Sequence, residues 1–198
     1  VEVLAFDANG GSASTLEEVT VLRTTGRFPT LVWADEFDAD GAVDPAKWKP
    51  QTLPPADGGW FNGEHQHYTD RLDNAYVSDG TLKIVARREV FTIEGSTKQY
   101  TSARLNSRFF FTYGRVEVRA RLPSQGGTWP AIWTLGTNIN ERGNPFGDTY
   151  GDVGWPACGE IDILEQTGWD KGSTIAHFHW GDTETGEYHN EGGSIANP

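Results

Sequence analysis

The sequence predicts an all-β fold, a sandwich or jelly roll, and three observations support this. Segments such as TLKIVARR (81–88) and GRVEVRARL (114–122) alternate apolar and polar residues, and a period of two is that of a half-buried strand. The 24 Gly and 10 Pro supply the turns that many short strands require. No segment of ten or more residues holds a helical period. Short antiparallel strands joined by long loops are therefore expected.

The composition excludes several classes of protein. The 198 residues suffice for one domain with a hydrophobic core. The 28 acidic and 16 basic side chains give a net charge of −12, which argues against nucleic acid or an anionic membrane as a partner. The single cysteine excludes an intrachain disulfide framework, and no apolar run reaches the roughly 18 residues of a membrane span. The 8 Trp point instead to a ligand with apolar and polar sides.

The expected elements follow in order along the chain. Residues 1–28 read as two strands and a linker, and thus as the end of a preceding β-module or as an edge hairpin. Residues 29–198 form the main domain. Its expected strands are 81–88, 114–122, 131–136, 160–166 and 173–180. Between them, residues 138–158 form a long loop rich in Gly and Asn, and a loop of that length inside a compact domain is usually functional.

The segment GEIDILE (159–165) places three acids within six residues of an apolar strand. Glu160 and Asp162 share one face of a regular strand, whereas Glu165 would point to the other face. A β-bulge at 163–164 would return Glu165 to the face of the other two. Like charges so close raise at least one pKa, which keeps a proton available near neutral pH.

This arrangement suits a glycosidase, in which one carboxylate is the nucleophile and a second is the acid/base. Asp162 would hydrogen-bond the nucleophile and tune both titrations. The alternative is a solvated face of exposed acids. The apolar neighbours Ile161, Ile163 and Leu164 argue against it, because they indicate a buried strand, where acids are rarely accidental.

The segment GWPACGEIDILEQTG (154–168) resembles the active-site strand of glycoside hydrolase family 16, in its laminarinase-like, bulged form. The resemblance covers about residues 31–181. It implies a concanavalin A-like jelly-roll sandwich with a concave substrate cleft, and it assigns Glu160 as nucleophile, Asp162 as assisting residue and Glu165 as acid/base. Further segments that match the family are LVWADEFD (31–38), WFNGEHQHYT (60–69), SDGTLKIVARRE (78–89), YTSARLNSRFFFTYGRVEVRARLP (100–123) and GGTWPAIWTLG (126–136).

Three tryptophans are candidates for a sugar platform. An indole stacks on the apolar C–H face of a sugar ring, while the edge hydroxyls meet polar groups. The resemblance implies that Trp129, Trp133 and Trp155 line the donor-side subsites. Trp133, between Ile132 and Leu135, fits a core position as well.

Three polar residues complete the predicted sugar site. Asn62 matches a family Asn that hydrogen-bonds sugar near the cleavage point, and its alternative role is that of a turn residue. Arg104 matches a family Arg that reaches substrate hydroxyls, with a surface ion pair as the alternative. His179 matches a family His near the acid/base residue, where a hydrogen-bonding role is expected.

Catalysis of this kind requires no cofactor, but two metal sites can be considered. The resemblance implies a structural calcium ion, with Gly80 offering a backbone carbonyl and Glu36 lying in the matching N-terminal segment, since hard oxygen ligands suit calcium. The two His-x-His pairs, at 65–67 and 177–179, have a spacing that can bind zinc, but no third ligand follows at a suitable spacing.

The resemblance also bears on the extent of the chain. Family domains continue for several dozen residues beyond the motif HWG (179–181), so we expect the domain 29–198 to be incomplete at its C-terminus. A nicked C-terminal remainder of the same domain would be a partner. No signal peptide is present in this sequence, as in a mature secreted protein, and an extracellular location is expected.

Residues and resemblance together predict a secreted, endo-acting, retaining hydrolase. Its polysaccharide substrate would be β-1,3-glucan (laminarin) or a mixed-linkage β-glucan. Two alternatives stay open. One is an agarase, porphyranase or carrageenase of the same family, and the sulfated galactans among these substrates are anionic and would require basic residues concentrated in the cleft. The other is a non-catalytic β-glucan-binding protein. Such proteins typically lack one or both glutamates, and both are present here.

Overall fold

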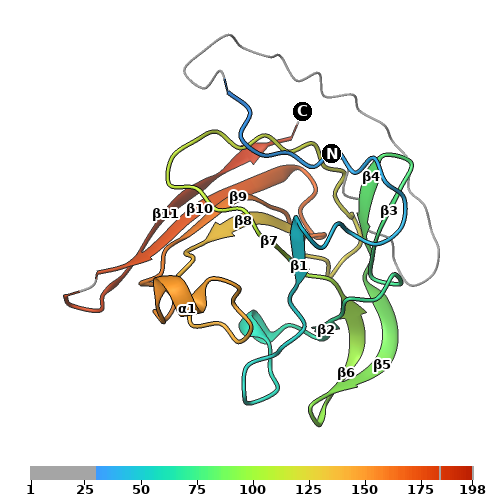
Figure 1. The fold of residues 1–198 in the computed structure, drawn as a ribbon, viewed down its shortest axis with the longest axis horizontal. Helices are drawn as coiled ribbons and strands as arrows, with labels where there is room; N and C mark the ends of the chain where they lie inside the picture. Colours follow the sequence, from blue (N-terminus) through green and yellow to red (C-terminus); the bar gives the residue numbers. More distant parts are fainter. Residues whose placement is uncertain (1–29, 183, 198) are drawn as a thin grey trace. The chain divides into compact units, whose positions relative to one another are not determined.

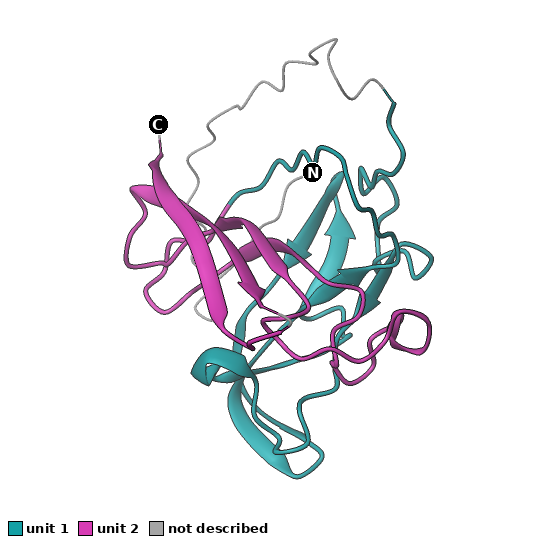
Figure 2. Ribbon diagram, turned by 90° about the vertical axis from the view of Figure 1, so that its left-hand side faces the viewer, with its two compact units in different colours: residues 1–121 teal, residues 122–198 magenta. Residues whose placement is uncertain are grey.

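The computed structural model describes residues 30–182 and 184–197, which divide into two compact units between residues 121 and 122 (Figure 2). The segment 1–28 lies outside the described residues. Both units consist of strands and loops (Figure 1), and helix in the described part is limited to α1 (Gly147–Tyr150) and the 3-10 turn η1 (Phe61–Gly63). The predicted all-β class is confirmed. Among these residues there is no helix with the length and apolarity that a membrane crossing requires.

Unit 1 contains the strands β1 to β7 in three small sheets. Strand β1 pairs antiparallel with β7, and β3 with β4, while β6 pairs parallel with β2 and antiparallel with β5. Asp79 and Gly80 join β3 to β4 with positive φ angles of 51° and 69°, as an Asp-Gly hairpin turn requires. The bounds are β1 (Trp48–Pro50), β2 (Gln66–Tyr68), β3 (Ala75–Ser78), β4 (Thr81–Ile84), β5 (Arg87–Ile93), β6 (Ser96–Ser102) and β7 (Leu105–Ser107).

The core of unit 1 is small and is built on the β3–β4 hairpin. Phe37, Val77 and Leu82 are buried together, and partly buried apolar side chains pack around them, namely Val43, Trp48, Ile84 and Leu105. Burial of such side chains is the main source of stability in a domain of this size.

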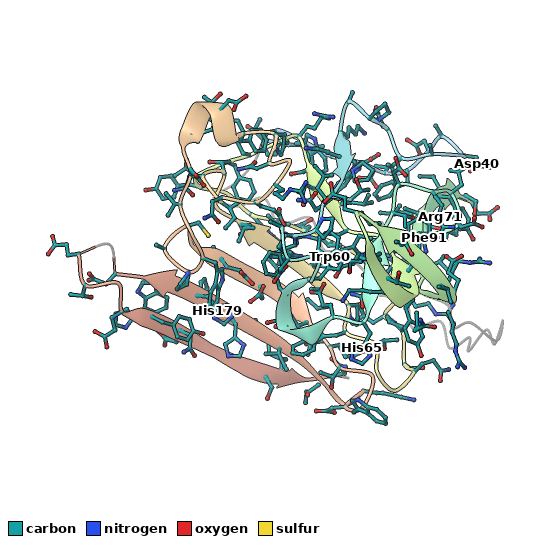
Figure 3. All side chains as sticks on the ribbon, turned by 90° about the horizontal axis from the view of Figure 1, so that it is seen from below. Asp40, Trp60, His65, Arg71, Phe91 and His179 are labelled. Atoms are coloured by element: carbon teal, nitrogen blue, oxygen red, sulfur yellow. The ribbon has the colours of Figure 1, made fainter. Side chains whose placement is uncertain are left out.

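A buried polar cluster lies beside this core. Asn74, which is fully buried, donates from Nδ2 to the Val85 carbonyl and to Thr101 Oγ1, both at 3.0 Å. Arg71 donates to Asn74 Oδ1 and forms an ion pair with Glu89, and its guanidinium lies 4.7 Å from the centre of the Phe91 ring (Figure 3). We call Arg71, Asn74, Glu89 and Thr101 the Asn74 cluster.

Two strand predictions in unit 1 were wrong. The segment 81–88 is divided between β4 and β5. Asn74, opposite Val85, turns its own N–H to the Arg71 carbonyl at 2.9 Å, and its side-chain amide takes the Val85 carbonyl in place of a backbone donor. Lys83, expected on a wet face, is buried and donates to the Ser78 carbonyl. The segment 114–122 forms no strand. Alternation identifies a face that can be half buried, but a strand also needs a hydrogen-bonding neighbour, and none of the described residues supplies it.

Unit 2 contains one antiparallel sheet of four strands in the order β11–β10–β9–β8 (Figure 1). Three of the strands agree with the predictions for 131–136, 160–166 and 173–180. The bounds are β8 (Ala131–Leu135), β9 (Glu160–Glu165), β10 (Ser173–Gly181) and β11 (Tyr188–Ala196).

Strand β9 carries the predicted bulge. On one side, Ile132 pairs with Leu164 while Trp133 pairs with Asp162, so β9 has one residue more than β8 at this point. On the other side, the register with β10 shifts in the same interval. The expected burial of the apolar flanks was wrong, since Ile161 is 43% exposed and Ile163 is exposed too. An apolar pattern identifies the face suited to burial, but not what covers it.

The loop 138–158 is held by its own backbone and by one side chain. Ile139 and Val153 form a parallel bridge across it, and the Asn144 amide donates to the carbonyls of Thr137 and Ile139, both at 2.8 Å. The loop includes α1 and then a cis peptide bond between Trp155 and Pro156. Trp155 lies near the end of this loop, five residues before Glu160 along the chain.

Candidate active site

The three acids of β9 share one face of the unit 2 sheet, as the bulge requires. Asp162 is only 4% exposed and is hydrogen-bonded to Glu160. Two carboxyl groups can share a hydrogen bond only when one of them holds a proton. The contact with Asp162 favours the protonated form of Glu160.

The pKa values of both glutamates lie above the ordinary range. Burial is the largest cause for Glu160, followed by the charge and the hydrogen bond of Asp162, and together they raise its pKa to about 7. Burial and then the charge of Asp162 raise the pKa of Glu165 as well. The direction agrees with the prediction of a proton held near neutral pH, but burial contributes more to it than the like charges from which it was predicted.

Each glutamate is held by an indole N–H. Trp155 Nε1 donates to Glu160 Oε2 at 2.8 Å, and Trp129 Nε1 donates to Glu165 Oε1 at 2.8 Å. The two indoles are 50% and 60% exposed, so their rings remain open to a ligand. Both indoles therefore lie beside the carboxyl groups with exposed rings, as a sugar platform at this site would require.

Trp133 lies on the same face as the acids. Its cross-strand partner on β9 is Asp162, and directly opposed residues of neighbouring strands point to the same side of a sheet. The side chain is half buried. Of the two interpretations of Trp133, the position at the site is favoured over the core position.

His179 connects the acids to β11. Its Nε2 lies 3.1 Å from Asp162 Oδ2, and its Nδ1 lies 2.8 Å from the hydroxyl of Tyr188. Figure 3 labels His179 on this sheet. A hydrogen-bonding His was expected here from the sequence. Tyr188 was not predicted at the site, because YHNEGGSIA (188–196) is polar and glycine-rich and shows no apolar alternation.

His177 was also not assigned to the site, although it lies on the same face. It pairs with Asp162 across β9 and β10, and its charge lowers the pKa of Glu165, against the larger effect of burial. A Cβ on its β11 partner Gly192 would lie 1.9 Å from His177 Cδ2. Glycine at 192 therefore makes room for the imidazole ring, a signal that appears only once the register is known.

Asn62 and Arg104 both belong to unit 1. Asn62 is in η1 with a positive φ of 55°, which agrees with its alternative role as a turn residue. The Arg104 guanidinium lies 5.9 Å from the centre of the Phe61 ring. The contact of both residues with sugar stays a prediction.

Neither His-x-His pair supports a zinc site. In the first pair, both ring nitrogens of the buried His67 are occupied, by the Trp60 indole at 3.0 Å and by the Ser96 carbonyl at 2.8 Å. In the second pair, His179 is held by Asp162 and Tyr188. Ligand atoms of Glu160, Asp162 and His179 lie within 4.8 Å of one another, but the hydrogen bonds described above already account for this arrangement.

The calcium site stays a prediction. Glu36 and Gly80 are both exposed residues of unit 1. Within residues 30–182 and 184–197, Glu36 belongs to no group of three or more carboxylate, imidazole or thiol ligands. Calcium prefers six to eight oxygen ligands, and one exposed carboxylate with one carbonyl falls short of that number.

Comparison with known proteins now places the chain. Residues 62–196 match the model of the glycosyl hydrolases of family 16. The chain belongs to this family. The match includes β9 with its three acids and both segments that hold the indoles Trp129 and Trp155. The family-16 resemblance of the sequence is therefore confirmed.

Two relatives show how far the likeness extends. The catalytic domain LamAcat from Zobellia galactanivorans has 65% sequence identity and a TM-score of 0.84, over 86% of this chain and 68% of that one. LamA of the same organism has also been solved in complex with laminaritriose and laminaritetraose. The β-glucanase of Rhodothermus marinus is 49% identical over 143 residues, and this chain spans 44% of its length. These family-16 neighbours confirm the jelly-roll class.

Proposed function

We propose that the protein is an endo-acting, retaining glycoside hydrolase of β-1,3-glucan (laminarin) or of mixed-linkage β-glucan. The observation that carries the proposal is the acidic face of β9, where Glu160, Asp162 and Glu165 lie together and an exposed indole holds each glutamate. The relatives support the substrate class, since laminari-oligosaccharides are bound in a structure with 65% identity and a β-glucanase is 49% identical.

In the proposed reaction, Glu160 attacks the anomeric carbon and Glu165 protonates the leaving oxygen. The raised pKa of Glu165 keeps the proton that this step needs. The ionised Glu165 then takes a proton from water, which releases the sugar from Glu160 with net retention of configuration. Glu160 has to be ionised before it can attack, and the neighbouring carboxyl group of Asp162 opposes that ionisation.

Two alternative functions have relatives of their own. A keratan-sulfate endo-1,4-β-galactosidase from Sphingobacterium multivorum is 35% identical over 137 residues, so a galactan hydrolase is the nearest rival. A β-1,3-glucan-binding protein from Penaeus monodon is 31% identical over 198 residues, which keeps a binding protein as the second rival. The intact pair Glu160 and Glu165 favours catalysis over binding alone.

One experiment separates these functions. Laminarin, lichenan and agarose are incubated with the protein, and reducing ends and oligosaccharide products are followed over time. We expect short oligosaccharides from laminarin at early times, with the β-anomer seen first by ¹H NMR, and no product with Glu160→Ser. Products from agarose alone would favour the galactan hydrolase. Binding of laminarin without new reducing ends, or unchanged hydrolysis by Glu160→Ser, would overturn the proposal.

The location of the protein and its binding of a structural calcium ion can be tested apart from the reaction. An extracellular location follows from a polymeric substrate that does not enter cells, and detection of the protein in the culture medium of its source tests it. Catalysis requires no cofactor in this scheme. A structural calcium ion at Glu36 and Gly80 would raise the melting temperature of the wild type but not of Glu36→Gln when calcium is added to chelator-treated protein.

A further inference from the structure

Tyr188 occupies a place at the site that the proposed reaction does not yet use. It begins β11 opposite Gly181. Asn190, two residues later, pairs with His179, so Tyr188 lies on the same face as the acids. Its ring is stacked on that of His179, with centres 6.0 Å apart and planes at 10°, and the two side chains share the 2.8 Å contact between Oη and Nδ1.

The contacts of His179 define which ring nitrogen carries its proton. A neutral imidazole has one N–H, and a carboxylate can only accept. Asp162 Oδ2 lies 3.1 Å from His179 Nε2, and a carboxylate at that distance needs a donor. The hydrogen must then sit on His179 Nε2, which faces Asp162 Oδ2. The other nitrogen, Nδ1, is left as an acceptor for the Tyr188 hydroxyl.

We propose that Tyr188 is a positioning residue, which holds His179 in the Nε2–H tautomer so that His179 donates to Asp162 and orients it beside Glu160. For its effect on the reaction, this inference rests on the proposed function. The chain of hydrogen bonds runs from the Tyr188 hydroxyl through the imidazole ring to Asp162 and ends at Glu160. The first two links cross from β11 to β10 and from β10 to β9, and the last joins two residues of β9.

Loss of the Tyr188 hydroxyl has a defined consequence. His179 Nδ1 would no longer face a fixed donor, and the ring could carry its proton on Nδ1 instead. The lone pair of Nε2 would then face Asp162, which removes a donor from that carboxylate. Asp162 and Glu160 would hold their shared proton more tightly, so ionisation of Glu160 would require a higher pH. The titratable groups that face His179 among the described residues are Glu160, Asp162 and Glu165 on β9, His177 on β10 and Tyr188 on β11.

The first test reads the tautomer directly and needs no activity. Long-range ¹H–¹⁵N NMR spectra of the imidazole rings are recorded at pH 8 for the wild type and for Tyr188→Phe, which keeps the ring and removes the hydroxyl. We expect the Nε2–H pattern for His179 in the wild type and a mixture of both tautomers in the variant. An unchanged Nε2–H pattern in Tyr188→Phe would overturn the proposal. Because this measurement is independent of hydrolysis, it stands even if the proposed function fails.

The second test reads the effect on the reaction. In Tyr188→Phe, the acid limb of kcat/KM on laminarin should move to higher pH by about half a unit, with about a threefold loss at pH 6, since one unit corresponds to a tenfold change. KM should change less than about twofold, because the ring that flanks the site is retained. A lower melting temperature with an unmoved acid limb would show a purely structural role and would overturn the proposal.

Two variants serve as controls. Tyr113→Phe removes a hydroxyl from a side chain that is almost fully exposed in unit 1 and should leave both readouts at wild-type values. His179→Gln keeps an N–H donor near the position of Nε2 but has no tautomers. In the His179→Gln background, Tyr188→Phe should cause no further shift of the acid limb. An additional shift of the same size there would mean that Tyr188 acts by a route other than His179.

Discussion

The Asn74 cluster of unit 1 and the acidic face of unit 2, which carries Glu160, Asp162 and Glu165, shift the pKa values of their carboxyl groups in opposite directions. In the Asn74 cluster, the Arg71 guanidinium and the Thr101 hydroxyl hold the pKa of Glu89 below its usual value. On the acidic face, burial and the neighbouring charge of Asp162 raise the pKa of Glu160 to about 7. In the Asn74 cluster the carboxylate has a cation and hydrogen-bond donors as neighbours, whereas on the acidic face like charges lie together. The first arrangement stabilises the fold, whereas the second retains protons for chemistry at a cost in stability.

The contrast predicts that substitutions in the two regions separate catalysis from folding. Glu165→Ala should lower the hydrolysis of laminarin by about 10³-fold, since general acid and base assistance is lost, while the melting temperature stays at or above that of the wild type. Azide should restore turnover of an activated aryl β-glucoside, because it attacks the glycosyl-enzyme without a general base. Steady-state kinetics and thermal unfolding measure both effects. Wild-type rates in Glu165→Ala would contradict its assignment as acid/base, and the control Glu191→Ala, an exposed acid on the other face of the sheet, should change neither quantity.

Asn74→Ala should give the reverse result. Its side chain is fully buried and donates to the Val85 carbonyl and to Thr101, and the carbonyl would lose this donor. Thr101 keeps Arg71 and Glu89 as partners, so the unsatisfied group is the Val85 carbonyl. We expect the free energy of unfolding to fall by about 2 kcal/mol, with unchanged kcat per folded molecule. Denaturant unfolding and active-site titration test this. Thr92→Ala, which breaks the exposed hydroxyl contact with Thr97, is the matched control and should cost less than about 0.5 kcal/mol. If Asn74→Ala lowered the free energy of unfolding as little as this control does, the cluster would not be a stabilising element.

These two regions also differ in how much of them could be predicted from the sequence. Strand parity alone required a bulge at 163–164 once three acids were expected on one face, and the register confirms it. The Asn74 cluster had no sequence signal, because its contacts join β5, β6 and the segment before β3, and pairing of distant segments is not contained in local periodicity.

Within the site, residue type was predictable and side-chain direction was not. Trp155 was expected as a sugar platform, but its N–H bond to Glu160 depends on the path of the loop 138–158. Tyr188 was missed because β11 lacks apolar alternation. The segment 114–122 shows the opposite error, since it alternates perfectly and forms no strand in the described structure. Periodicity indicates which face is suited to burial, but a strand forms only where a neighbouring segment supplies hydrogen bonds.

The raised pKa of Glu160 predicts the acid limb of the pH profile. If Glu160 attacks in its ionised form, kcat/KM should fall about tenfold for each pH unit below 7. Rates on laminari-oligosaccharides between pH 4 and 9 measure the limb. Asp162→Asn removes the neighbouring charge, which is the second cause of the shift after burial, and should move the limb to lower pH without restoring the usual value. A limb that stays in place in Asp162→Asn would show that Asp162 does not influence the titration of Glu160.

The smallest expected effect is on stability, and it has the opposite sign from that of Asn74→Ala. A carboxyl group with a pKa raised from 4.5 to about 7 on folding binds more protons in the folded chain than in the unfolded chain between these values. The free energy of unfolding therefore falls as the pH rises through this window, and the full penalty is present above pH 7.

Glu160→Gln is neutral at every pH and should be more stable than the wild type at pH 8 by about 1 kcal/mol, a figure discounted for the solvent that still reaches this half-buried group. The difference should vanish below pH 4.5, where the wild-type carboxyl is protonated in both states. Urea unfolding at pH 4, 6 and 8 measures it, with Glu191→Gln as the control that should show no such trend. A gain that is equal at pH 4 and pH 8 would mean that it arises from packing and not from the release of like charges.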